Sequence, residues 1–198
     1  ALDTETVRYD IDRNGTFEFS RVIDRSRDAI QRDTGYLVGN AAASGVPGEI
    51  SLPIEAQATY GYAADGRLSQ VANPLVANQA FNYAYKANSN LVASVSGPIH
   101  TVSNTWMPNR EQLDVKQNKV GGTVISSFDY QLDFMDRRDS VTTNGTAFPN
   151  LPKWTWGYDE RSQIISADSN VAGYDRSYEY DAIGNRKKSA DSLTLPVA

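Results

Sequence analysis

The stretch YEYDAIGNR, from Tyr178 to Arg186, decides the fold of this 198-residue chain. Side chains alternate along a β-strand with a period of two, so Tyr178 and Tyr180 are predicted to lie on one face of a strand. Asp181 and Gly184 follow, and both residue types favour turns, because Gly takes a positive φ without steric cost. The stretch therefore predicts a strand that carries an aromatic pair and runs into a turn.

The same phrase returns several times upstream. Its second aromatic position, at residues 62, 85, 106, 132, 158 and 180, recurs in steps of roughly 21 to 26 residues, the range typical of repeat arrays. Looser copies contain Trp106 and Leu132, an early copy runs from Tyr9 to Phe17, and residues 36–58 have the weakest repeat character. The clear copies supply the candidate structural motif: Tyr60, Tyr62, Asp65 and Gly66; Tyr83 and Tyr85; Trp156, Tyr158 and Asp159; Tyr178, Tyr180, Asp181 and Gly184.

Each copy reads as strand, turn and strand. Asp65-Gly66 suits a tight hairpin, and Leu68 to Val71 then alternates as a returning strand. A single hairpin is marginally stable in water, so each must stack on its neighbours, with the tyrosines forming a ladder between them. We predict an all-β fold, an array of about seven hairpins in a curled or spiral sheet, over a single repeat region, residues 1–198.

A helix is the competing interpretation for one segment only. Residues 24–39 could hold a short helix with Gly35 near its end. Elsewhere, apolar residues do not recur with helical spacing, and Gly and Asn interrupt most segments.

The phrases YEYDAIGNR and YGYAADGRL resemble the YD repeat of the Rhs family, which runs roughly Tyr-x-Tyr-Asp-x-x-Gly-Arg-Leu. This family includes the BC components of insecticidal toxin complexes and the teneurins. The resemblance implies a spiral β-sheet that closes into a hollow shell, around a toxic segment in the bacterial toxins or within a cell-adhesion ectodomain in teneurins. This sequence has fewer repeats than a closed shell and lacks the Asp-Pro-x-Gly type motif of self-cleavage. Neither encapsulation nor autoproteolysis therefore carries over to it, and we expect a fragment of a longer shell or a short relative.

Composition narrows the class of partner. The net charge of -5 and a pI of 4.9, with basic residues scattered, argue against nucleic-acid binding. The absence of cysteine excludes disulfides, thiolate metal sites and a cysteine nucleophile. No apolar run is long enough for a membrane span.

Catalytic and cofactor motifs are not evident in the sequence. His100 is the only histidine, and neither a Gly-x-Ser-x-Gly elbow nor a phosphate-binding loop is found. Asp10, Asp12, Asn14 and Gly15 match the first half of a calcium loop, but position twelve is Arg21 instead of Glu. The turn interpretation of residues 10–15 is favoured, and no enzyme activity, cofactor or metal is expected.

The expected function is structural. We predict a scaffold or shell-wall segment of a secreted or cell-surface Rhs-type protein, bacterial in origin, with flanking repeats or domains of a longer chain as partners. One alternative is a carbohydrate-binding or adhesion module that uses exposed Tyr and Trp. Another is a free-standing array that self-associates through its open sheet edges.

Overall fold

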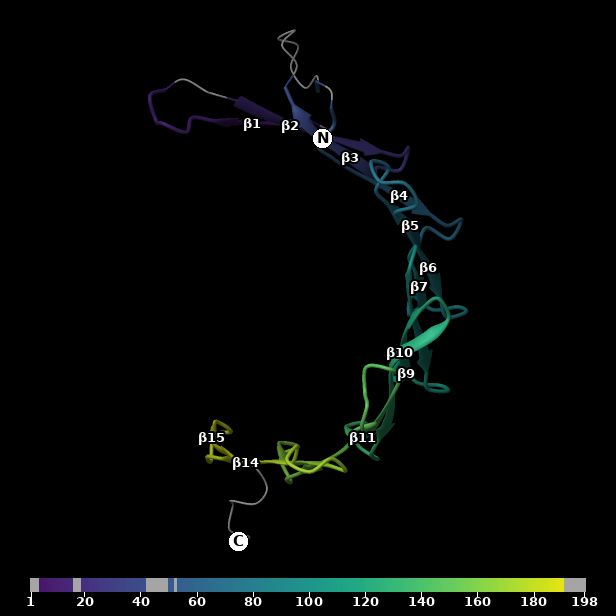
Figure 1. Cartoon of the computed structure of the whole chain (residues 1–198), viewed down its shortest axis with the longest axis vertical. Helices are drawn as coiled ribbons and strands as arrows, with labels where there is room; N and C mark the ends of the chain where they lie inside the picture. Colours follow the sequence, from purple (N-terminus) through teal and green to yellow (C-terminus); the bar gives the residue numbers. More distant parts are fainter. Residues whose placement is uncertain (1–3, 16–18, 42–49, 52, 191–198) are drawn as a thin grey trace. The chain divides into compact units, whose positions relative to one another are not determined.

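The computed structural model describes residues 4–15, 19–41, 50–51 and 53–190, and these form an all-β structure (Figure 1). The prediction of an all-β hairpin array is confirmed. The strands are β1 (Thr4–Tyr9), β2 (Phe19–Arg27), β3 (Asp33–Asn40), β4 (Ala56–Tyr62), β5 (Leu68–Ala72), β6 (Ala80–Tyr85), β7 (Val92–Ser96), β8 (His100–Trp106), β9 (Leu113–Val120), β10 (Thr123–Leu132), β11 (Arg138–Asn144), β12 (Lys153–Tyr158), β13 (Ile164–Ser169), β14 (Arg176–Tyr180) and β15 (Arg186–Ala190).

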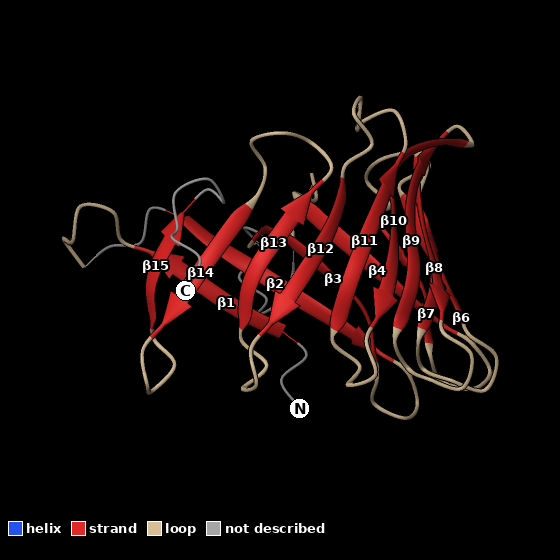
Figure 2. Cartoon of the chain, turned by 90° about the horizontal axis from the view of Figure 1, so that it is seen from below, coloured by secondary structure: helices blue, strands red, loops and turns tan. Residues whose placement is uncertain are grey.

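The order of the strands in the sheet is their order in the sequence. Contacts divide the chain into two compact units, residues 1–90 with 95–98 and residues 91–94 with 99–198. In each unit, antiparallel hairpins pair with the next hairpin along the chain. Figure 2 shows this meander in the second unit, where β10 to β15 lie side by side with turns at both ends. After β1, the described strands form seven hairpins, from β2–β3 to β14–β15. The six from β4–β5 onward correspond to the predicted copies at positions 62, 85, 106, 132, 158 and 180, whereas β2–β3 was not predicted as a copy.

The hairpin turn predicted at Asp65-Gly66 is present in the structure. Ala63 N–H donates to the carbonyl of Arg67, and Gly66 N–H donates to the carbonyl of Ala63. This is a turn followed by one residue in the left-handed region, where Gly66 has φ +85°. In three other hairpins a residue other than glycine stands at the equivalent position with φ between 62° and 68°: Gln31, Asp136 and Ser162.

A β-bulge follows every one of these turns whose register is described. In the β4–β5 hairpin, Gly61 pairs with Gln70 and Tyr62 with Leu68, so Ser69 is the extra residue. The same shift occurs one residue before the end of β2, β8, β10, β12 and β14. Bulges increase the local twist and re-aim the strand. The beginning of each second strand is therefore turned relative to the rest of the sheet.

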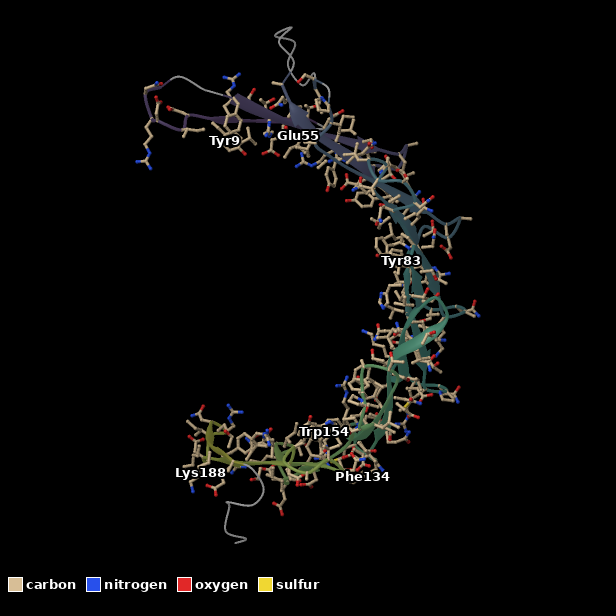
Figure 3. All side chains as sticks on the ribbon, in the orientation of Figure 1. Tyr9, Glu55, Tyr83, Phe134, Trp154 and Lys188 are labelled. Carbon is tan, nitrogen blue, oxygen red and sulfur yellow. The ribbon has the colours of Figure 1, made fainter. Side chains whose placement is uncertain are left out.

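Burial in the sheet is shallow. Among the described residues, the buried hydrophobic side chains are Val22, Val141 and Ala167, and only Val22 is fully buried. Side chains project from both sides of the ribbon in each unit (Figure 3). The aromatic side chains therefore pack on a single sheet instead of filling a two-layer core, and interactions between neighbouring hairpins must supply much of the stability.

Three segments differ from simple copies of the repeat. Residues 24–39 comprise the end of β2, a turn and most of β3, so the helix alternative is wrong there. Of the degraded region 36–58, the structure describes the end of β3 and the start of β4, whereas residues 42–49 and 52 lie outside the described residues. Of the early copy, Tyr9 ends β1 and residues 10–15 lie in the connection to β2, at the opposite end of β2 from the β2–β3 turn, whereas Thr16 and Phe17 lie outside the described residues.

Candidate functional site at the hairpin junctions

The turn between β10 and β11 shows how an aspartate organises these loops. Oδ1 of Asp133 accepts hydrogen bonds from the backbone N–H groups of Met135 and Arg137, at 2.8 and 2.9 Å. Its Oδ2 accepts a 2.7 Å bond from Nε of Arg137. An aspartate that satisfies backbone donors two and four residues ahead fixes the turn locally. Equivalent carboxylates are Asp28, Asp159 and Asp181.

The bulge separates each hairpin from the next near the turns. The backbone ladder between β11 and β12 begins at Ser140, and that between β13 and β14 at Ser166, one residue beyond the bulge in each case. Between this first backbone pair and the turns, two neighbouring hairpins share no described backbone pairing. We call this part of the boundary between two hairpins the junction. Here the sheet lacks backbone pairing and a side chain bridges the strands.

A tyrosine hydroxyl provides that bridge. At the junction between β11 and β12, for example, Tyr158 is the last residue of β12 and its hydroxyl donates to the carbonyl of Arg138, the first residue of β11. The same bond forms at four junctions, with lengths of 2.7 or 2.8 Å. Trp106 does the same with its indole Nε1, 3.1 Å from the carbonyl of Val92. The four tyrosine bonds are Tyr62 to Asp33, Tyr85 to Leu68, Tyr158 to Arg138 and Tyr180 to Ile164.

A guanidinium group covers three of these tyrosine rings. Arg137, the fifth residue of the β10–β11 turn, lies 4.3 Å from the centroid of Tyr158 while it remains paired with Asp133. A cation over an aromatic face is attracted by the ring quadrupole. The matching pairs in the first unit are Arg32 over Tyr62, at 4.3 Å, and Arg67 over Tyr85, at 4.6 Å.

These contacts shift the titration of the groups involved. Burial alone raises the pKa of Asp133, but hydrogen bonds from Arg137 and Met135 outweigh it and hold the pKa below its ordinary value of 3.8. Burial also raises the pKa of Tyr158 above its ordinary value of 10.0, against the opposing charge of Arg137. Asp133 is therefore ionised and Tyr158 is a hydroxyl donor at neutral pH.

The predicted motif residues divide into two groups. The second aromatic of each copy, at positions 62, 85, 158 and 180, lies at a junction, whereas Tyr60, Tyr83, Trp156 and Tyr178 lie earlier in their strands. The ring-on-ring contacts found in the described residues involve other side chains, such as Trp154 with Tyr174 and Phe128 with Phe148. Contact between hairpins at the predicted tyrosines is therefore made by guanidinium and hydroxyl groups.

Sequence reasoning missed the arginines. The signal was available, since Arg67 follows Tyr62 by five residues, and the family phrase also places an arginine after its glycine. The junction between β9 and β10 has no tyrosine at the bridging position. Leu132 takes the tyrosine position at the end of β10, and Arg110 pairs with Asp136 between successive turns.

The half calcium loop forms a turn. Asp10 accepts hydrogen bonds from the N–H groups of Asn14 and Gly15, and Asp12 accepts from the backbone and side chain of Asn14. No group of three or more potential metal-ligating side chains is found where the structure describes the chain. Within the same residues, no helix has the length and apolar character needed to cross a membrane.

Comparisons with known proteins give a fold but no close relative. No protein-family model and no curated protein matches this sequence. Among solved structures, the Tc holotoxin pore of Photorhabdus luminescens matches 88% of this chain with a TM-score of 0.52 and 14% identity, over 11% of that chain. The crystal structure of TcdB2-TccC3 matches 87% of it with a TM-score of 0.51 and 14% identity, over 12% of that chain.

This likeness confirms the expected fold. The matched structures are Rhs-repeat shell proteins of Tc toxins, as the resemblance of the YD phrases implied. At 14% identity the match shows a shared fold. The chain spans about a tenth of the length of those structures.

Proposed function

We propose that this chain is a segment of the wall of an Rhs-type shell and acts as a scaffold in a toxin-complex setting, without catalytic activity. The observation that carries the proposal is the junction, whose tyrosine or tryptophan bridge recurs at five of the described boundaries between hairpins. The fold likeness to Tc toxin structures over most of the chain supports it. In this proposal the chain works together with flanking repeats of a longer polypeptide that is secreted or displayed at the cell surface.

The junction tyrosines do not favour carbohydrate binding. Four of their hydroxyls donate to backbone carbonyls, and three of their rings lie under arginines. A sugar platform needs an accessible aromatic face with free polar neighbours. We therefore propose no glycan site at these residues.

The native polypeptide provides the test. An antibody raised against this chain is used to isolate the source protein, whose intact mass is measured and whose particles are imaged by electron microscopy. We expect a polypeptide several times larger than 21.7 kDa and a hollow particle whose wall contains this segment. A polypeptide of 21.7 kDa without an enclosed volume contradicts the proposal and favours a free-standing, self-associating array.

A further inference from the structure

Three junctions contain a guanidinium group with three partners of the same kinds: a tyrosine ring, a turn carboxylate and an oxygen of the next turn. In the Tyr158 junction, Arg137 contacts the tyrosine ring, the turn carboxylate of Asp133 and the hydroxyl of Ser162 on the next turn, 3.1 Å away. The junctions of Arg32 and Arg67 repeat this set, with a backbone carbonyl of the next turn as the third partner. Ring, carboxylate and turn acceptor together define a guanidinium site within the fold.

The Tyr180 junction has the site but a different side chain. Tyr180 bridges to Ile164 as the other tyrosines do, yet the fifth residue of the preceding turn is Gln163 instead of arginine. The hydrogen bonds to the carboxylate of Asp159 in the described structure both end on Oδ1, from the N–H groups of Arg161 and Gln163. Its Oδ2 corresponds to the atom that binds arginine Nε at Asp28 and Asp133.

A hollow of about 660 Å³ occupies this junction. Its lining includes the Tyr180 and Tyr178 side chains, together with Asp159 and Gln163 from the preceding turn. Carboxylates outnumber bases in the lining by four to two, and the bases are Arg161 and Lys187. The hollow therefore combines an aromatic surface with an acidic lining, and Gln163 brings no positive charge to it.

The basic side chains near the hollow make contacts different from those of Arg32, Arg67 and Arg137 at the other three junctions. Arg161 donates from Nη1 to the carbonyl of Ala182, at 2.7 Å, which is a different acceptor from those used at the other junctions. Arg186 lies over Tyr178, 5.8 Å from its centroid, and Lys188 pairs with Glu179. Among the described cation–ring contacts, the ring of Tyr180 has none of the kind made by Arg32, Arg67 and Arg137.

We infer that the Tyr180 junction is a binding site for an arginine side chain of a partner polypeptide, which inserts its guanidinium between Asp159 and the Tyr180 ring. The site follows from comparison of this junction with its three filled counterparts and does not depend on the shell proposal. A planar guanidinium suits it better than an ammonium group, because it can stack on the ring and donate in two directions at once. The partner presents this arginine on an extended segment or loop that reaches the turns of β12–β13 and β14–β15.

N-acetyl-arginine amide is the probe, with the uncharged N-acetyl-citrulline amide as its matched control. The probe is titrated into the full chain while the aromatic NMR signals of Tyr180 are followed. We expect saturable, millimolar binding of the arginine compound and at least tenfold weaker binding of citrulline. Equal shifts with both compounds, or no shift at Tyr180, contradict the proposal.

Two variants locate the site. Gln163→Arg supplies an internal guanidinium, so it should raise the melting temperature and weaken probe binding at Tyr180 at least tenfold. Arg137→Gln should open an equivalent second site, seen as new probe-dependent shifts at Tyr158. Unchanged binding in a folded Gln163→Arg protein overturns the inference, and so does the absence of a new site in folded Arg137→Gln.

Discussion

The hydroxyl of Tyr158 lies 2.7 Å from the carbonyl oxygen of Arg138, a residue 20 positions earlier that begins the preceding hairpin's second strand. This bond spans the gap that the bulge leaves in the backbone ladder. Because the same bond recurs at Tyr62, Tyr85 and Tyr180, one contact type joins successive hairpins in both units.

Removal of this hydroxyl should weaken the sheet measurably. Tyr158→Phe keeps the ring under Arg137 but leaves the Arg138 carbonyl without its donor, so we expect a loss of about 1 kcal/mol in unfolding free energy. Urea denaturation followed by circular dichroism measures it. The exposed Tyr174 provides the control, since Tyr174→Phe should change stability by less than half as much. Equal effects of the two substitutions contradict a bridging role.

Arg137 and Tyr158 should be energetically coupled. Their guanidinium–ring contact is partly shielded, with the Arg137 side chain 22% exposed. A double-mutant cycle with Arg137→Ala and Tyr158→Leu should give a coupling free energy of about 0.5 to 1 kcal/mol. Arg137→Lys should recover only part of the loss, because an ammonium group does not reproduce the planar fork. A coupling near zero contradicts the contact as a source of stability.

The left-handed turn position should distinguish glycine from alanine. Gly66 has φ +85°, and an added Cβ would meet Nη1 of Arg32 at an ordinary contact distance of 3.6 Å, so Gly66→Ala introduces backbone strain without a steric clash. We expect a loss of about 1 kcal/mol in unfolding free energy. Gly61→Ala is the control, because a Cβ there meets neighbours at ordinary contact distance, 3.4 Å or more. Loss of stability at Gly61 but not Gly66 contradicts this assignment.

Acid should destabilise the turns. The pKa of Asp133 is lowered in the folded chain, mainly because the hydrogen bonds of Arg137 overcome the effect of burial. A lowered pKa contributes stability above the ordinary value of 3.8 that is lost as the pH falls below it through the folded-state pKa. Thermal melts between pH 7 and pH 2 should therefore show a smaller acid-dependent decrease in Asp133→Asn than in the unmodified protein. Glu160→Gln, on the neighbouring turn, serves as the control for loss of a turn carboxylate.

Calcium should leave the stability unchanged. Asp10 and Asp12 use their carboxylate oxygens for turn hydrogen bonds to Asn14 and Gly15. The melting temperature in millimolar calcium chloride should equal that in the presence of a chelator. An increase of several degrees that is lost in Asp12→Asn contradicts the turn assignment and indicates an ion site.

Local chemistry made the hairpins predictable. The period-two aromatic pair at Tyr178 and Tyr180 and the turn residues Asp181 and Gly184 act within a few positions of one another, so the sequence determined the strands, the turns and the all-β class. It also determined the repeat spacing and thereby the likeness to YD-repeat proteins. The turn predicted at Asp65-Gly66 is present, with Gly66 at positive φ. The bulge that follows it was not predicted, because several residue types occupy the left-handed position and the sequence signature of a bulged turn is therefore weaker.

Only the tertiary structure decided how the hairpins join. Tyr62 and Asp33 are 29 residues apart in sequence, and their bond depends on the bulge that turns the start of β3. Arg67 looks like an ordinary turn residue until the next hairpin brings Tyr85 beneath it. Such contacts depend on the register between separate hairpins, which the sequence pattern within one repeat leaves open. For the same physical reason, the absence of arginine at Gln163 became meaningful only when its junction could be compared with the others.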